Sequence, residues 1–503
     1  MHATAPTLSE SAPQIKDLGR AALGLIAVAT VLRIAFAAVL PAGVDEAYSI
    51  GVARQFALSY FDHPPLHLWL VGVWARLTGS EALLVLRLPF IALGALSSWL
   101  MYRLGAGLFG ARAGLWALIL FTLAPVFGVV HLTLILPDGP LIAAALGTAL
   151  VVVRIVFGQQ SQPLALWALV GLLAGLALLS KYHGALLILG VLLFLATTAE
   201  GRRLLLTPGP WLAAVIAAIC FLPVVVWNAQ NDWVSFGFQS ARSEVGNAFR
   251  WLGPLESLAI QAGYLLPWIF VPLAWALWRA IAGGPTDPRR WLLACLAILP
   301  IVIFTLLTVF SRGLAHWQMP GWLFAVPLAG ELLAHAGPRL LRAARIVAIA
   351  TAVLLVALLA IGAPQARWGT FDAVFRPIGD PTDALVSWTE LKPELEARGL
   401  LGPQTFIASS NWIRAGQLNA LFGKHIPVLC LCDDARQFTW LNPPERYAGW
   451  TGIVIDTPGR IDEKAWPFAS VSTPEEIGLT KAGRVVMPLK LLIGKGFTPA
   501  ASR

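Results

Sequence analysis

Charged residues are scarce in this sequence. Asp, Glu, Lys and Arg make up 13% of its 503 residues, whereas soluble globular proteins average about 25%. Residues 1–363 hold 21 basic and 13 acidic residues, and the much shorter segment 364–503 holds 15 and 14. This distribution excludes an ordinary soluble enzyme. It predicts a transmembrane domain over residues 1–363 and a soluble domain over residues 364–503.

Cysteine is also sparse, with four residues in the chain. Cys220 and Cys295 lie in apolar runs. Cys430 and Cys432 are close in sequence, but two cysteines supply too few ligands for a zinc site. The HExxH pattern of metalloproteases is absent, although metal binding remains the competing interpretation of the loops that carry His, Asp and Glu. A basic stripe interleaved with aromatic residues is absent as well, so we expect no nucleic-acid partner.

Long apolar runs dominate the first part of the chain. Runs of about 17–25 residues can span a bilayer as helices. They lie near residues 21–40, 82–101, 113–131, 139–157, 163–180, 184–199, 209–227, 257–278, 291–310, 318–336 and 346–363. We therefore expect about eleven transmembrane helices, the first of them a retained anchor. Segment 63–78 is shorter and begins with two prolines, which favours a helix lying in the membrane interface.

Positive charge predicts the orientation. With the N-terminus inside, the inner loops hold thirteen Lys and Arg residues and the outer loops of the transmembrane domain hold six, as expected when the inner side is cytoplasmic. An odd helix count then places residues 364–503 on the outer face of the membrane. Short apolar stretches such as TFIAS, IPVLCL and GIVIDT alternate there with turn residues, which predicts a soluble α/β domain.

Acidic residues gather in the outer loops. Asp45 and Glu46 follow the first predicted helix, and Asp138 lies in the loop after the third. Two carboxylates that face each other across one cavity can take a proton from an incoming hydroxyl group and orient it. A carboxylate pair is equally typical of a glycosidase, and a lone carboxylate often caps a helix.

Basic and polar residues accompany these acids on the outer side. Lys181, His63, Arg87 and Arg312 are candidates for neutralising the phosphate of a lipid-linked substrate. A charge inside a span costs about 2.5–3.5 kcal/mol on insertion scales, so Arg87 needs a partner unless it extends to the lipid headgroups. Substrate-positioning roles are predicted for four further residues: Asp62, Tyr182, His183 and His316.

Four segments carry a family resemblance. They are VDEAYSIGVARQFALSYFDHPPLHLWL (44–70), LPDGP (136–140), LLSKYHGALLILG (178–190) and HWQMPGW (316–322). Together they resemble the GT-C membrane glycosyltransferases, in the branch of the bacterial protein mannosyltransferases and the lipid A aminoarabinose transferase. The resemblance implies a polyprenyl-phosphate sugar donor and a hydroxyl acceptor on a glycolipid, another envelope glycan or a protein. It also implies inversion at the anomeric carbon and no obligatory metal.

The resemblance further implies roles for single residues. Asp45 matches the family's essential acid, with Glu46 beside it; Asp138 matches the acid of the second outer loop, and Lys181 is expected to face the donor phosphate. His63 departs from the pattern, since relatives acting on lipid A have lysine before the paired prolines, and imidazole is a weaker phosphate ligand. Two other functions stay open: a lipid or glycan transporter and a non-catalytic subunit of polymer assembly. Whether Asp45 or Glu46 lies closer to the acceptor is also open.

Overall fold

A computed structural model describes residues 11–158, 163–241, 249–311, 313–463 and 465–499. Its contacts divide the chain into two compact units. Unit 1 comprises residues 1–34, 63–66 and 88–355, and unit 2 comprises residues 35–62, 67–87 and 356–503. Helices α1 (Ala12–Val39), α4 (Leu83–Phe109) and α16 (Pro338–Trp368) contribute residues to both units.

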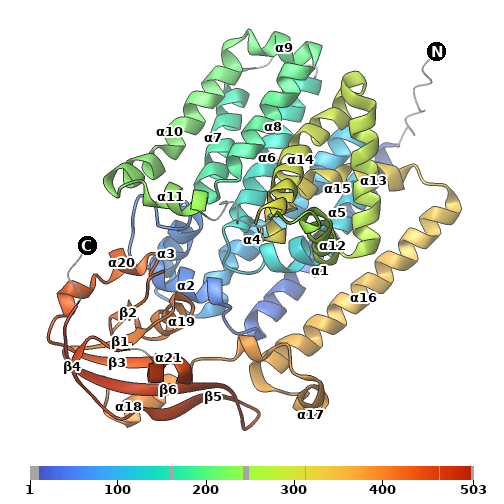
Figure 1. The fold of residues 1–503 in the computed structure, drawn as a ribbon. Helices are drawn as coiled ribbons and strands as arrows, with labels where there is room; N and C mark the ends of the chain where they lie inside the picture. The colour runs from blue at the N-terminus through green and yellow to red at the C-terminus, as the bar shows by residue number, and fades with distance from the viewer. Residues whose placement is uncertain (1–10, 159–162, 242–248, 312, 464, 500–503) are drawn as a thin grey trace. The chain divides into compact units, whose positions relative to one another are not determined.

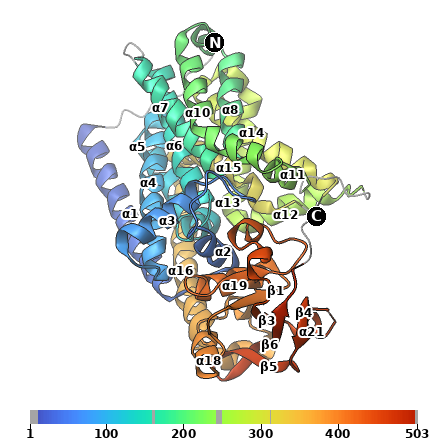
Figure 2. The ribbon, with the colours of Figure 1, turned by 90° about the vertical axis from the view of Figure 1, so that its left-hand side faces the viewer.

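Unit 1 is helical. Figures 1 and 2 show α6, α7, α8 and α10 running side by side, and α15 packs between α5 and α14. Besides its parts of α1, α4 and α16, the unit contains α5 (Ala111–Leu123), the π-helix η1 (Val126–His131), α6 (Asp138–Phe157), α7 (Leu164–Ser180), α8 (Gly184–Thr197), α9 (Ala199–Leu205), α10 (Pro208–Gln230), α11 (Val234–Ala241), α12 (Gly253–Leu265), α13 (Pro267–Gly283), η2 (Gly284–Thr286), α14 (Pro288–Leu306), η3 (Leu307–Val309), η4 (Ala315–Gln318) and α15 (Met319–Ala334).

Small residues let these helices approach closely. A Cβ atom added to Gly171 of α7 would lie 2.5 Å from the carbonyl oxygen of Ala213 in α10. A Cβ atom on Gly330 of α15 would lie 2.5 Å from the carbonyl oxygen of Ala113 in α5. Close packing at glycine and alanine is typical of helix pairs in membranes, where burial of apolar surface gives little driving force.

Six helices in the described part of the chain are long and apolar enough to cross a membrane, or up to eight if each of two bent pairs is one span. The count of eleven spans stays a prediction. The expectation of one continuous helix over 257–278 is wrong, because α12 and α13 meet at 114°. Leu266 at the break has φ +71 and precedes Pro267. A residue before proline is disfavoured in the α conformation, whereas proline is well suited to begin the next helix.

Unit 2 contains a sheet of six strands in the order β2-β1-β3-β6-β4, with β5 pairing on β6. The strands are β1 (Thr405–Ser409), β2 (Val428–Cys430), β3 (Thr451–Asp456), β4 (Phe468–Val471), β5 (Glu475–Lys481) and β6 (Arg484–Phe497). Strand β1 is parallel to β2 and β3, and β6 is antiparallel to β3, β4 and β5. The apolar stretches at 405–409, 426–431 and 452–457 therefore supply the parallel strands, which confirms the predicted α/β domain.

Short helices complete unit 2, and one of them, α19, joins the sheet to α2. Helix α19 packs on α2 as well as on β1 and β2 (Figures 1 and 2). Gly51 of α2 permits this contact, because a Cβ atom there would clash with the side chain of Asn419. The helices are α2 (Val44–Val52), α3 (Leu66–Thr78), α17 (Asp372–Phe375), η5 (Arg376–Ile378), η6 (Asp383–Leu385), α18 (Leu391–Ala397), α19 (Trp412–Phe422), α20 (Phe438–Leu441), η7 (Pro444–Tyr447) and α21 (Pro458–Glu463).

The domain boundary at residues 363 and 364 stays a prediction. Helix α16 runs through both residues without a break. Unit 2 also includes residues 35–62 and 67–87, which the sequence analysis assigned to the transmembrane domain.

A buried ionic cluster in unit 2 joins β5 to the end of α16 and to the segment that follows it. Lys481 Nζ lies 2.6 Å from Asp380 Oδ2, and the side-chain amide of Gln365 donates to the same oxygen at 2.7 Å. Burial raises the pKa of the Asp380 carboxyl, but the hydrogen bonds from Lys481, Gln365 and Thr382 outweigh it and hold that pKa well below its ordinary range. Asp380 is therefore ionised in the folded protein at neutral pH.

We expect this cluster to make stability fall in acid. Because the folded-state pKa of Asp380 is depressed, its stabilisation is present above the ordinary Asp pKa of about 3.9 and is lost as pH falls below that value. Asp380→Asn should cost about 2 kcal/mol at pH 7, and the difference from wild type should shrink toward pH 3. Thermal unfolding of the full-length protein in detergent between pH 7 and 3 measures this. Asp462→Asn, at a more exposed pair with Lys490, is the control; equal pH profiles for wild type and Asp380→Asn would contradict the expectation.

Candidate active site

A buried ion pair lies at one end of two helices of unit 1. Asp138 is the first residue of α6, and Lys181 directly follows α7. Lys181 Nζ lies 2.9 Å from Asp138 Oδ1 and 3.2 Å from Oδ2, and both side chains are almost fully buried. An ammonium group has three donors, and these contacts engage two oxygens of one carboxylate. Lys181 can therefore donate a further hydrogen bond to another anionic group.

Histidines surround this pair within unit 1. His131, at the end of η1, has its Nε2 atom 3.9 Å from Asp138 Oδ1. His316 interacts electrostatically with Asp138, and His63 does so with His183. The ring of His183 stacks on Phe304 at 4.7 Å. The structure thus brings together most of the candidates in this unit, and it adds His131, which the sequence analysis did not select.

Tyr182 has different neighbours. Its hydroxyl group lies 2.9 Å from the Ser235 hydroxyl of α11, and its ring meets those of Phe221 and Phe236 edge to face. Asn228 Oδ1 in turn accepts from the backbone N–H of Ser235. Tyr182 therefore attaches α11 to the segment between α7 and α8. Its substrate-positioning role stays a prediction.

Glu46 and Arg87 form a second buried pair, in unit 2. Arg87 donates from Nε to Glu46 Oε1 at 2.8 Å and from a terminal nitrogen to Oε2 at 2.5 Å. The guanidinium also donates to the carbonyl oxygens of Ala37, Leu40 and Pro41, and Arg87 is fully buried. All five N–H groups of Arg87 are thereby engaged. The pair fixes the end of α1 to the starts of α2 and α4, and its roles in catalysis and donor binding stay predictions.

Asp45 differs from its neighbour Glu46. Both lie in the first turn of α2, where Glu46 accepts from the backbone N–H of the N-cap residue Gly43. Successive helix residues point about 100° apart, so Glu46 is directed into the protein, with 1% of its surface exposed, while Asp45 is exposed. Of the two carboxylates, Asp45 is the one accessible to a hydroxyl substrate.

Asp62 is held by residues far along the chain in unit 2. The Tyr48 hydroxyl donates to Asp62 Oδ1 at 3.2 Å, and Arg436 lies 3.5 Å from Oδ2. The guanidinium of Arg436 lies 3.5 Å above the ring of Trp412, and Gln437 accepts from the backbone N–H of Phe61. The Arg436–Gln437 segment therefore fixes the loop that carries Asp62. Neither Arg436 nor Gln437 was among the residues selected from the sequence.

The Tyr48 phenol remains protonated within this network. Burial raises its pKa well above the ordinary value, and the charge of Asp62 raises it further, against smaller opposing effects from Gln437 and Arg436. A neutral phenol donates one hydrogen bond and accepts another. It donates to Asp62 and accepts from the backbone N–H of Gln437 at 3.2 Å.

Arg436→Gln should loosen this network. The expected loss of stability is about 1–2 kcal/mol, because a partly desolvated cation–π contact and an ion pair disappear together. Thermal unfolding of the full-length protein in detergent measures the loss. Arg446→Gln, at an exposed position outside this network, is the matched control. An Arg436→Gln midpoint equal to that of Arg446→Gln would contradict the expected role.

Arg312, a predicted ligand of the donor phosphate, lies outside the described residues. Within the described part of the chain, no group of three or more His, Cys, Asp or Glu side chains is arranged to hold a metal ion; metal-independent transfer stays a prediction. Asp45 belongs to unit 2 and Asp138 to unit 1, and their pairing across one cavity also stays a prediction.

Comparison with solved structures identifies the fold. The chain has the fold of ArnT from Cupriavidus metallidurans, in a crystal structure bound to undecaprenyl phosphate: the TM-score is 0.63 at 18% identity, over 93% of this chain and 97% of that chain. The apo structure of the same protein gives a TM-score of 0.63 at 17% identity, over 94% and 98% of the two chains. The predicted GT-C-type fold, a multi-pass helical membrane protein with a C-terminal α/β domain, is confirmed.

Sequence comparison gives two further likenesses. Residues 62–227 match the dolichyl-phosphate-mannose-protein mannosyltransferase family. The chain is 27% identical over 304 residues to the lipid A galacturonosyltransferase RgtD of Rhizobium johnstonii, a match that covers 59% of this chain and 62% of that protein. The chain thus aligns with less than two thirds of this curated relative. The resemblance to the GT-C membrane glycosyltransferases is confirmed.

Proposed function

We propose that this protein is a membrane glycosyltransferase that moves a sugar from a polyprenyl-phosphate donor to a hydroxyl group of an acceptor. The acceptor is a glycolipid of the lipid A or lipopolysaccharide type, another envelope glycan or a protein. The observation that carries the proposal is the exposed carboxylate of Asp45 at the start of α2, in the segment that most resembles the family. The ArnT fold and the similarity to a lipid A galacturonosyltransferase support it.

The proposed reaction is an inverting displacement. The acceptor oxygen forms a bond to the anomeric carbon while the bond from that carbon to the phosphate oxygen breaks, and the electron pair leaves with the polyprenyl phosphate. Asp45 takes the proton of the acceptor hydroxyl group. Lys181 and His63 stabilise the charge on the departing phosphate. Asp138 holds Lys181 in position through the ion pair at 2.9 Å. No metal ion takes part in this scheme.

Two observations support an active site and a soluble domain that face the periplasm. The inner loops predicted from the sequence carry more Lys and Arg than the outer loops, as the positive-inside rule requires. Cys430 and Cys432 of unit 2 form a disulfide, and disulfides persist in oxidising compartments such as the periplasm. Together they favour a multi-pass protein of the bacterial inner membrane with the soluble domain outside.

Lipid mass spectrometry of a deletion strain tests the function. Deletion should cause one polyprenyl-phosphate-linked sugar to accumulate while one envelope glycan loses the same sugar, and the wild-type gene should reverse both changes. Unchanged lipid and glycan pools, under conditions in which the gene is expressed, would contradict the proposal. If the donor lipid accumulates on the cytoplasmic leaflet alone and purified protein transfers no sugar, a transporter is the better explanation.

A further inference from the structure

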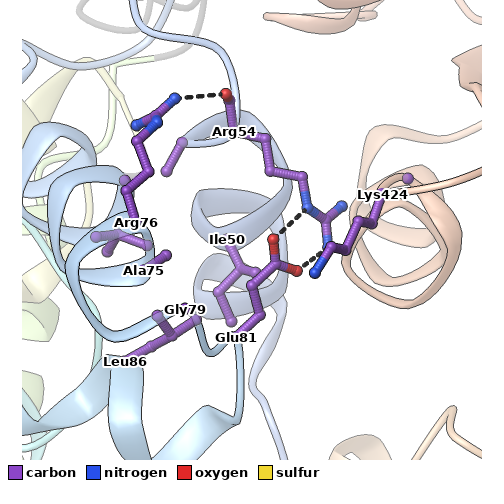
Figure 3. A pocket seen from close by; sticks show the side chains of 12 residues that line it. Ile50, Arg54, Ala75, Arg76, Gly79, Glu81, Leu86 and Lys424 are labelled. Carbon is purple, nitrogen blue, oxygen red and sulfur yellow. Dashed lines mark hydrogen bonds and ion pairs between the residues drawn. The ribbon is translucent and has the colours of Figure 1, made fainter.

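A pocket in unit 2 lies among α2, α3 and the loop after α19 (Figure 3). Its volume is about 410 Å³, within the range of small-ligand sites. Its apolar lining includes Ile50, Val71 and Leu86, all of them buried. Four charged residues also line it: Arg54, Arg76, Glu81 and Lys424. We call it the cationic pocket.

One of these cations is already neutralised. Arg54 donates to both oxygens of Glu81, at 2.9 and 3.4 Å, and to the carbonyl oxygens of Asn419 and Ala420. Figure 3 shows the guanidinium facing the carboxylate of Glu81. Burial raises the pKa of Glu81, but Arg54 and the charge of Lys424 lower it below its ordinary value. Glu81 is therefore ionised at neutral pH and offsets Arg54.

Two cations remain. Arg76 donates through one terminal nitrogen to the carbonyl oxygen of Arg54 at 3.0 Å, and most of its five N–H groups stay available. Lys424 lies close enough to Glu81 to act on its pKa. Arg76 and Lys424 are both exposed, so the pocket has an apolar base, a net charge of about +2 from its four charged side chains and access from solvent.

The shape of the pocket depends on close packing behind it. A Cβ atom on Gly72 of α3 would lie 2.5 Å from the carbonyl oxygen of Ala53 and 3.0 Å from a terminal nitrogen of Arg76. Helix α3 is thus held against the end of α2, and Arg76 is directed to the edge of the cavity. Two cations above an apolar base fit an amphiphile whose anionic group, a phosphate or a carboxylate, adjoins apolar atoms.

We propose that the cationic pocket binds the anionic headgroup of a lipid, namely a phosphate or carboxylate of the glycolipid acceptor. Arg76 and Lys424 contact the anion, and the apolar base accepts the adjoining part of the lipid. Arg54, paired with Glu81, holds the C-terminal end of α19 in place through the carbonyl oxygens of Asn419 and Ala420. The identity of the lipid as the acceptor rests on the proposed function, whereas the binding of an anionic headgroup does not.

Native mass spectrometry of the full-length protein in detergent tests the proposal. The probes are lipid A with both phosphates, lipid A from which both have been removed, and phosphatidylglycerol. Arg76→Gln with Lys424→Gln should weaken binding of the phosphorylated lipid A at least about tenfold, since each lost contact is a charge-assisted hydrogen bond. Arg446→Gln with Arg460→Gln removes the same charge from two exposed positions and should change binding less than about twofold.

A second variant fills the pocket without changing its charge. Ala75 is a half-buried lining residue, and Ala75→Phe should weaken binding of phosphorylated lipid A while the dephosphorylated lipid binds weakly to every variant. An equal loss for phosphatidylglycerol and phosphorylated lipid A identifies a site for bilayer phospholipid and overturns the acceptor assignment. Wild-type binding by both pocket variants overturns the site itself. Because the readout needs no sugar transfer, a failed transferase assay leaves the result on the pocket intact.

Discussion

Asp45→Asn should lower the rate of sugar transfer about 10²–10⁴-fold, the range that a general base contributes. Asn has nearly the shape of Asp but cannot take the proton of the acceptor hydroxyl group. Asp45 is exposed in the first turn of α2, so the substitution should leave the fold unchanged. The measurement is single-turnover transfer by purified protein with saturating polyprenyl-phosphate sugar, together with a thermal unfolding curve.

A matched exposed acid provides the control. Asp17→Asn changes an aspartate of α1 that is 72% exposed and paired with Arg20, and it should leave transfer within about twofold. Asp45→Asn should retain the wild-type unfolding midpoint and the donor KM. Transfer by Asp45→Asn within about twofold of wild type would exclude a catalytic carboxylate at this position.

Arg87→Met should destabilise the protein by about 3–5 kcal/mol, because it leaves the Glu46 carboxylate buried without its partner. Three carbonyl oxygens, those of Ala37, Leu40 and Pro41, would also lose their donor. Glu46→Gln should cost less, since the amide oxygen still accepts from Arg87. Denaturation in mixed micelles at increasing SDS fraction measures these changes.

The exposed pair between Arg20 and Asp17 provides a control, which tests whether the loss of stability depends on burial of the ion pair or only on loss of the charge. Arg20→Met removes the same charge at a site where the two side chains are 67% and 72% exposed, and should change stability by less than about 1 kcal/mol. Arg87→Lys separates structure from substrate binding, because lysine cannot make the bidentate contact with Glu46. If Arg87→Lys raised the donor KM and left stability unchanged, the result would identify Arg87 as a phosphate ligand. It would contradict the structural role assigned to Arg87.

Local patterns were sufficient for the class of protein and for much of its secondary structure. Long apolar runs predict membrane helices because the bilayer selects on hydropathy and length alone. The stretch TFIAS predicts a strand that the structure places at the same residues, Thr405–Ser409. The prediction of one continuous helix over the apolar run 257–278 was wrong. Hydropathy does not report backbone conformation, so it could not show the break at Leu266 and Pro267.

Contacts between segments far apart in the chain could not be predicted from such local patterns. Arg436 lies 374 residues from Asp62 in the chain, yet the two side chains form an ion pair. Residues 35–62 belong to the same compact unit as residues 356–503, because α19 packs on α2. The cationic pocket likewise combines Arg76 with Lys424.

The sequence by itself determined a polytopic membrane protein with an α/β domain and the loops that carry its acids and bases, since hydropathy, turn residues and motifs are local properties. Only the tertiary structure distinguished Asp45 from Glu46. Both are adjacent carboxylates in one motif, and the helix directs one to solvent and the other to Arg87. Burial and partners decide what a carboxylate can do, and both depend on how segments far apart in the chain pack together.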